Sequence, residues 1–165
     1  MEPQTRALPM SDLDAIFDVL SIVHGYLLED ELAPDLVRRL LSSLADDGLL
    51  PEGASAGELN ALLADLGQRL HWAMSVGETY PEPLPRRTIY YLDVPDEGVE
   101  ACVAELTALG GDVGRPEAEA GVPSLGGQIA AAFPDLPPDP SHHARVAQLS
   151  ALADRYGGQL NGFGG

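Results

Sequence analysis

Apolar residues recur at three- and four-residue spacing in three stretches of the N-terminal half, and this spacing predicts three amphipathic helices. The first covers residues 11–27, with Ser11 as its opening residue, and the second covers residues 34–48. The third begins at Ser55, which forms an S-x-x-E capping box with Glu58. The predicted core positions are Leu13, Ile16, Phe17, Leu20, Val23, Leu27, Leu36, Val37, Leu40, Leu41, Leu44, Leu59, Leu62, Leu63, Leu66, Leu70 and Ala73. Because no single stripe can bury itself, we expect a small three-helix bundle.

The pattern changes after Pro81, Pro83 and Pro85, which predict a stiff extended connector. The stretch 88–94 (TIYYLDV) is rich in β-branched and aromatic residues and predicts a strand. A helix follows from residue 96 to the glycine pair 110–111, with Cys102 on its apolar side.

Four further elements are expected in the C-terminal half. Val113 begins a second strand, residues 128–133 (QIAAAF) form a third, and the glycine- and proline-rich stretch 114–127 has no definite prediction. A helix starts at Pro140–Ser141 and ends at a second glycine pair, and residues 159–163 form the last strand.

The resulting order is strand, helix, strand, strand, helix, strand, which is the split β-α-β arrangement of ferredoxin-like folds. Right-handed crossovers place both helices on one face of a four-stranded antiparallel sheet. We therefore predict an α+β protein, with an acidic helical region at residues 1–84 and a ferredoxin-like domain at residues 85–165.

The net charge of −17 comes from 26 acidic residues against nine arginines, with no lysine. Residues 1–84 hold 15 acids and four arginines (net −11), and residues 85–165 hold 11 and five (net −6). This balance opposes direct binding of nucleic acid, because neutralising phosphates requires basic groups. It suits either a highly soluble surface or docking on a basic protein.

The compartment is predicted from two features of the sequence. A long apolar run and a secretory leader are both missing, so we expect no membrane association. The single cysteine, Cys102, is predicted to be a buried free thiol, which fits a reducing cytoplasm.

No pattern in the chain predicts a catalytic residue, a metal ligand set or a cofactor. His142 and His143 are adjacent, and adjacent side chains on a helix diverge, so we expect an exposed pair that does not converge on one ion. Burial of Cys102 argues against a role as a nucleophile.

Acidic residues near predicted helix ends are the candidate binding site. Arginine and lysine side chains bind carboxylates through charge-assisted hydrogen bonds, so such clusters suit a basic protein partner. A solvated surface without a partner is the alternative. The candidate partner-binding residues are Glu29, Asp30, Glu31, Asp46 and Asp47.

The C-terminal half carries a short motif around its last helix. Leu149, Leu152 and Ala153 are followed by the segments 156–158 (YGG) and 161–164 (NGFG). With the strand 90–92 (YYL) and the helix exit 109–111 (LGG), this motif resembles the regulator of ribonuclease E activity B family of ribonuclease E inhibitors.

The resemblance spans roughly residues 86–165 and implies a non-catalytic protein that inhibits a ribonuclease by binding it. Asn161 stands where that family usually has aspartate, and Phe163 stands where it usually has tryptophan. The helical half has no counterpart in the family pattern, so the sequence does not determine which protein is inhibited.

Charge and resemblance favour an inhibitor or regulator that binds a basic protein, of which a nuclease is one candidate. An immunity protein that neutralises a toxin is a second version of the same idea. The other classes are a structural or oligomerisation module that forms homo-oligomers, and an enzyme or small-molecule binder that uses the sheet face.

Overall fold

A computed structural model describes residues 7–75, 79–114 and 127–164. Within these residues the chain is mixed α+β, with five helices and one four-stranded antiparallel sheet. The chain divides into two compact units, Met1–Leu84 and Pro85–Gly165.

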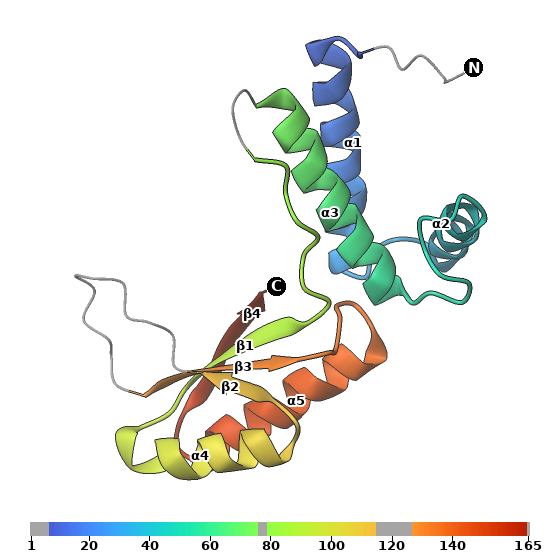
Figure 1. Cartoon of the computed structure of the whole chain (residues 1–165). Helices are drawn as coiled ribbons and strands as arrows, with labels where there is room; N and C mark the ends of the chain where they lie inside the picture. Colours follow the sequence, from blue (N-terminus) through green and yellow to red (C-terminus); the bar gives the residue numbers. More distant parts are fainter. Residues whose placement is uncertain (1–6, 76–78, 115–126, 165) are drawn as a thin grey trace. The chain divides into compact units, whose positions relative to one another are not determined.

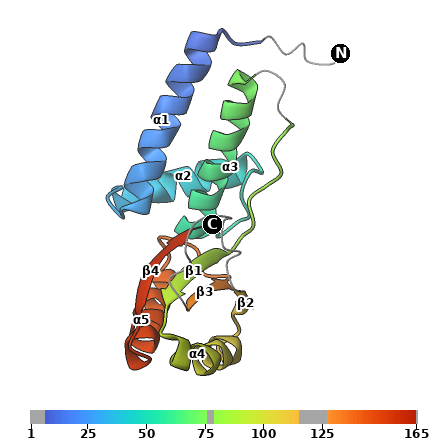
Figure 2. The ribbon, with the colours of Figure 1, turned by 90° about the vertical axis from the view of Figure 1, so that its left-hand side faces the viewer.

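The N-terminal unit contains α1 (Met10–Leu28), α2 (Pro34–Asp46) and α3 (Ala56–Met74). Helices α1 and α3 lie against each other along their length (Figures 1 and 2). The buried apolar side chains of this unit gather around α3 and are Leu27, Leu50, Leu59, Leu62 and Leu63. Helix α2 contributes only partly buried side chains.

The predicted capping box at the start of α3 is confirmed. The Ser55 hydroxyl accepts a hydrogen bond from the Glu58 main-chain N–H (3.1 Å), and the Glu58 carboxylate accepts one from the Ser55 N–H (2.8 Å). Two amides that the helix cannot satisfy itself are therefore paired.

The predicted start of α1 at Ser11 is wrong, because the helix begins one residue earlier. The Pro9 carbonyl accepts from the N–H groups of Asp12 and Leu13 (3.0 and 3.2 Å), which places Ser11 inside the first turn. The Ser11 hydroxyl bonds the Asp12 carboxylate (3.4 Å), so no side chain caps this helix.

Three predicted core residues of this unit are exposed, namely Ile16, Leu36 and Ala73. The helices carry more apolar residues than their mutual contacts can cover. One buried polar residue was missed: the Asp65 carboxylate accepts a hydrogen bond from the Leu84 main-chain N–H (2.8 Å). This bond ties the segment after α3 to the helix.

The C-terminal unit has the strand order β2-β3-β1-β4, and every neighbouring pair is antiparallel. Residues 115–126, which include most of the stretch without a definite prediction, lie outside the described residues. The strands and helices are β1 (Thr88–Asp93), α4 (Asp96–Ala108), β2 (Asp112–Gly114), β3 (Gln128–Phe133), α5 (Pro140–Arg155) and β4 (Gln159–Gly164).

Helices α4 and α5 cover the same face of the sheet (Figures 1 and 2). Burial alternates along the two central strands, so one side of β1 and β3 faces these helices and the other does not. The core on the covered face is Tyr90, Leu92, Val94, Val99, Cys102, Leu106, Ile129, Ala131, Phe133, Leu149, Leu152 and Ala153. The prediction that Cys102 is a buried free thiol is confirmed.

Gly158 lets the end of α5 turn closely past the end of β1. A Cβ atom at this position would lie 2.0 Å from the Asp93 carbonyl oxygen, which is part of the backbone and cannot move aside easily. The preceding residue, Gly157, has φ 73°, a left-handed conformation that favours glycine. The second glycine pair is therefore a steric requirement of the β1–β4 pairing.

We expect Leu59→Ala to lower the free energy of unfolding of the N-terminal unit by about 2–5 kcal/mol, because Leu59 is fully buried. The partly buried Trp72 lies in the same unit and is the only tryptophan, so its fluorescence during urea unfolding is the measurement. The control is Val19→Ala on exposed α1 surface, which should change the value by less than about 0.5 kcal/mol. Equal losses in the two variants would contradict the assigned core.

We expect Gly158→Ala to destabilise the C-terminal unit by about 1–3 kcal/mol, because the added methyl group collides with backbone. Gly164→Ala is the matched control, since a Cβ atom there meets nothing within 4 Å. Calorimetric melting of both variants tests the difference. A Gly158→Ala protein that melts like Gly164→Ala would show that the close approach is not required.

Candidate functional site

The predicted partner-binding residues are exposed and lie at the C-terminal ends of two helices. Glu29, Asp30 and Glu31 follow α1, and Asp46 and Asp47 end α2. The backbone at the first cluster is fixed by hydrogen bonds, including one from the Glu31 N–H to the Tyr26 carbonyl (2.8 Å). Hydrogen bonds therefore fix the backbone of residues 29–31, while their carboxylates face solvent.

These carboxylates do not stabilise the helices that carry them. The C-terminal end of a helix has a partial negative charge, which disfavours nearby acids. The last turns of α1 and α2 contain no basic residue. Across the part of the chain that the structure describes, none of the five carboxylates forms an ion pair. The five acids thus have no ion-pair partner among the described residues, and Glu29, Asp46 and Asp47 also lie at the negative ends of their helices.

The two clusters form separate patches. The first, at residues 29–31, adjoins the start of α2, and the second, at residues 46–47, lies at its far end. A helix of 13 residues is about 20 Å long, so one small ligand cannot contact both clusters. A protein surface of ordinary size can.

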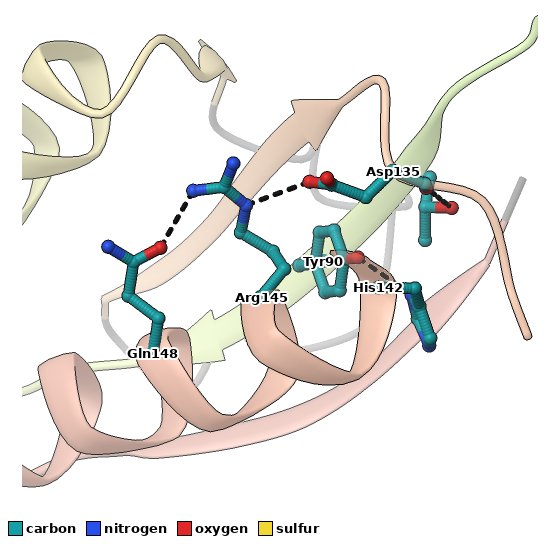
Figure 3. A network of polar contacts seen from close by, with 6 residues as sticks. Tyr90, Asp135, His142, Arg145 and Gln148 are labelled. Atoms are coloured by element: carbon teal, nitrogen blue, oxygen red, sulfur yellow. Dashed lines mark hydrogen bonds and ion pairs between the residues drawn. The ribbon is translucent and has the colours of Figure 1, made fainter. Parts of the chain in front are cut away.

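A network of polar contacts in the C-terminal unit, buried at Tyr90 and His142 and exposed at Gln148, was not predicted (Figure 3). The Tyr90 hydroxyl on β1 lies 2.8 Å from Nδ1 of His142, which comes from the first turn of α5. The Arg145 Nε donates to the Asp135 carboxylate (2.8 Å), and its Nη1 donates to the Gln148 side chain (2.7 Å). The network therefore links α5 to β1 and to the loop after β3.

Aromatic rings enclose the histidine of this network. The His142 ring stacks on Tyr90 with centroids 5.6 Å apart, and the Phe163 ring meets it edge-on at 4.4 Å. The Arg145 guanidinium lies 4.2 Å from the centre of the Phe133 ring, an arrangement that favours a cation. His142 is buried, whereas His143 is exposed, so the prediction of an exposed pair is wrong for His142.

Burial sets the protonation of the Tyr90–His142 pair. It raises the pKa of Tyr90 to about 12, and it lowers the pKa of His142, with His143 adding to the lowering and Asp135 and Asp139 opposing it. Both groups are therefore neutral near pH 7, joined by one hydrogen bond. Because the Tyr90 side chain is fully buried, the pair suits anchoring of α5 better than proton transfer to a substrate.

A signal for His142 was present in the sequence. His142 lies seven residues before Leu149, two turns along the same helix face, so it continues the buried stripe of α5. The burial of His142 was not predicted because a histidine at the start of a helix is usually solvated. Its partner Tyr90 is 52 residues away in the sequence, so no short-range pattern could predict the contact between them.

Cys102 does not provide a reactive thiol. Its side chain is buried, and burial raises its pKa, with Glu105 adding to the rise. Among residues 7–75, 79–114 and 127–164, no group of three or more His, Cys, Asp and Glu side chains is arranged to hold a metal ion. None of the helices described is long and apolar enough to cross a membrane.

A groove of about 340 Å³ lies between α1 and α3 in the N-terminal unit. Its lining is mainly apolar, with Phe17, Leu20 and Leu63 beside His24. The Nε2 atom of His24 is buried and has no hydrogen-bond partner among the residues described. A single imidazole nitrogen without a partner does not define a ligand class.

Comparison of the chain with protein-family models, with curated proteins and with solved structures found no match.

We expect the free energy of unfolding to fall as the pH drops below about 6.5, in part because of His142. Its folded pKa lies below its unfolded pKa, so the unfolded chain binds more protons in this window. His142→Gln should reduce the slope measured by urea unfolding between about pH 7 and 5, and His143→Gln should not. Equal slopes in the two variants would contradict the buried neutral assignment.

Proposed function

We propose that this protein is a non-catalytic inhibitor or regulator that acts by binding a basic protein, with a ribonuclease as one candidate. The observation that carries the proposal is the position of Glu29, Asp30, Glu31, Asp46 and Asp47. These acids are exposed and form no ion pair within the described residues, and Glu29, Asp46 and Asp47 lie at the negative C-terminal ends of α1 and α2. A partner that supplies arginine or lysine would compensate them.

We also infer a three-helix N-terminal region followed by a ferredoxin-like unit. The element order, the antiparallel order β2-β3-β1-β4 and the two helices on one sheet face support the second part. The contact of α1 with α3 and the partly buried leucines of α2 support the first.

The resemblance to ribonuclease E inhibitors supports the fold more than the partner. Leu149, Leu152 and Ala153 are buried in the core, and Gly158 is required by a close backbone approach. Buried apolar residues and glycines at close backbone contacts are shared by proteins of one fold because packing requires them, even when the proteins have different surfaces. The ribonuclease part of the proposal therefore rests on the resemblance and on charge, and an immunity protein against a basic toxin uses the same charge argument.

The first experiment is affinity capture from native lysate at low salt, with mass spectrometry of the retained proteins. A basic nuclease among them would identify the candidate partner, and a toxin would select the immunity version. A protein that captures nothing and forms a stable homodimer would instead be a structural module.

We expect Glu29→Lys/Glu31→Lys, and separately Asp46→Lys/Asp47→Lys, to slow association with the captured partner without unfolding the protein, with a melting temperature no lower than that of the wild type. Long-range attraction between opposite charges speeds encounter and weakens as salt rises. Asp30 is left unchanged because its φ of 58° is unfavourable for lysine. The measurement is surface-immobilised kinetics at low and physiological salt.

The matched control is Glu100→Lys/Asp154→Lys, two exposed acids of the C-terminal unit. All three double variants carry the same net charge, so a difference among them reports position and not total charge. Association that is equally slow in all three would assign the effect to net charge alone. An association rate that changes neither with the charge reversals nor with salt would contradict the proposal. The acidic residues would then serve solubility alone.

A further inference from the structure

Helix α1 has apolar residues on two sides, and only one side is covered. Its inner residues Leu20, Val23 and Leu27 belong to the core of the unit. A second set remains in solvent, which we call the outer face of α1. It consists of Ile16, Val19, Ile22 and Tyr26, which are 44%, 62%, 59% and 48% exposed.

The outer face is contiguous. Val19, Ile22 and Tyr26 follow one another at three- and four-residue steps, so they lie on one side of the helix over successive turns. Single exposed apolar residues are ordinary on protein surfaces, but an aligned row is typical of a surface that receives a partner helix. The outer face of α1 therefore has the spacing of a surface that binds another helix.

The charges around the outer face select that occupant. Helix α1 contains no lysine or arginine. Asp12 is exposed one turn before Ile16, at the N-terminal end of the row, and Asp18 is exposed beside the row on the side away from the core. The cluster at residues 29–31 continues the acidic border past the end of the helix. Apolar anchors with acids at both ends and along one side, and with no basic residue on the same helix, complement an amphipathic helix whose border is basic.

A second copy of this chain is a poor occupant by the same criterion. Pairing two α1 helices through their outer faces would bring acids of one copy near acids of the other. Like charges at an interface are destabilising, and both copies carry a net charge of −17.

We infer that the outer face of α1 binds an amphipathic helix of a basic protein, with leucine-like anchors on Val19, Ile22 and Tyr26 and arginine or lysine on the acidic border. This inference rests on the proposed function and adds the contact geometry. The acids then govern the rate of encounter, and the apolar row governs how long the complex lasts.

The test uses the full chain and two synthetic peptides of leucine and lysine. In the first peptide the leucines are spaced to form one helix face, and in the second the same residues are rearranged so that the leucines surround the helix. We expect the first peptide to bind more tightly in calorimetric titration. Val19→Ala/Ile22→Ala should weaken it by about tenfold or more and leave the weaker peptide unaffected.

Leu36→Ala/Leu49→Ala is the matched control, since both leucines are exposed elsewhere on the same unit. It should leave both affinities unchanged, and the melting temperature should be about the same in all variants because the four substituted side chains are exposed. Equal binding of the first peptide by wild type and Val19→Ala/Ile22→Ala would overturn the inference, as would binding of neither peptide.

Two further results separate this inference from the proposed function. If charge reversal at Glu29 and Glu31 still slows association with the captured partner while Val19→Ala/Ile22→Ala has no effect on that complex, the acidic function stands and the outer face is not its contact. If sedimentation shows a wild-type dimer that Val19→Ala/Ile22→Ala disrupts, the occupant is a second copy and the inference is wrong.

Discussion

Burial of the inner side of β1 is the constraint on which the C-terminal unit depends. This strand is central in the sheet, and Tyr90 and Leu92 are fully enclosed between the sheet and its helices. A tyrosine in that position must satisfy its hydroxyl, because an unpaired buried donor is costly. His142 supplies the partner, and through it the start of α5 is fixed relative to β1.

The other contacts of this unit follow from that arrangement. With α5 fixed, Arg145 reaches Asp135 and covers Phe133, while Leu149 and Leu152 fill the core one and two turns later. The helix then ends at a glycine pair that permits β4 to return beside β1. A polar bond, a cation over a ring and a close backbone approach thus act at successive points along one helix.

The N-terminal unit distributes its residues differently. Its core is smaller and made of leucines, and polar order appears mainly at the Ser55–Glu58 cap and at Asp65. Its helix ends carry acids that the dipole disfavours, and α1 leaves an apolar row in solvent. Both features are unfavourable in isolation. The basic partner that we propose would compensate both of them.

The sequence by itself determined most of the elements. Local periodicity, the S-x-x-E box and the glycine pairs are short-range signals, so the boundaries of α3, β1, α4, β3 and β4 were predicted to within a few residues. Exposure of the five candidate acids also followed directly, because charged side chains are seldom fully buried.

Only the tertiary structure decided which apolar and polar residues are covered. Ile16 and Val19 lie on the same helix as Leu20, and which of them face α3 depends on how the two helices pack. His142 and Asp65 are buried because distant segments, carrying Tyr90 and Leu84, bring hydrogen-bond partners to them. A residue's own neighbours in sequence specify its backbone conformation, but its burial is set by surfaces that meet only after the chain has folded.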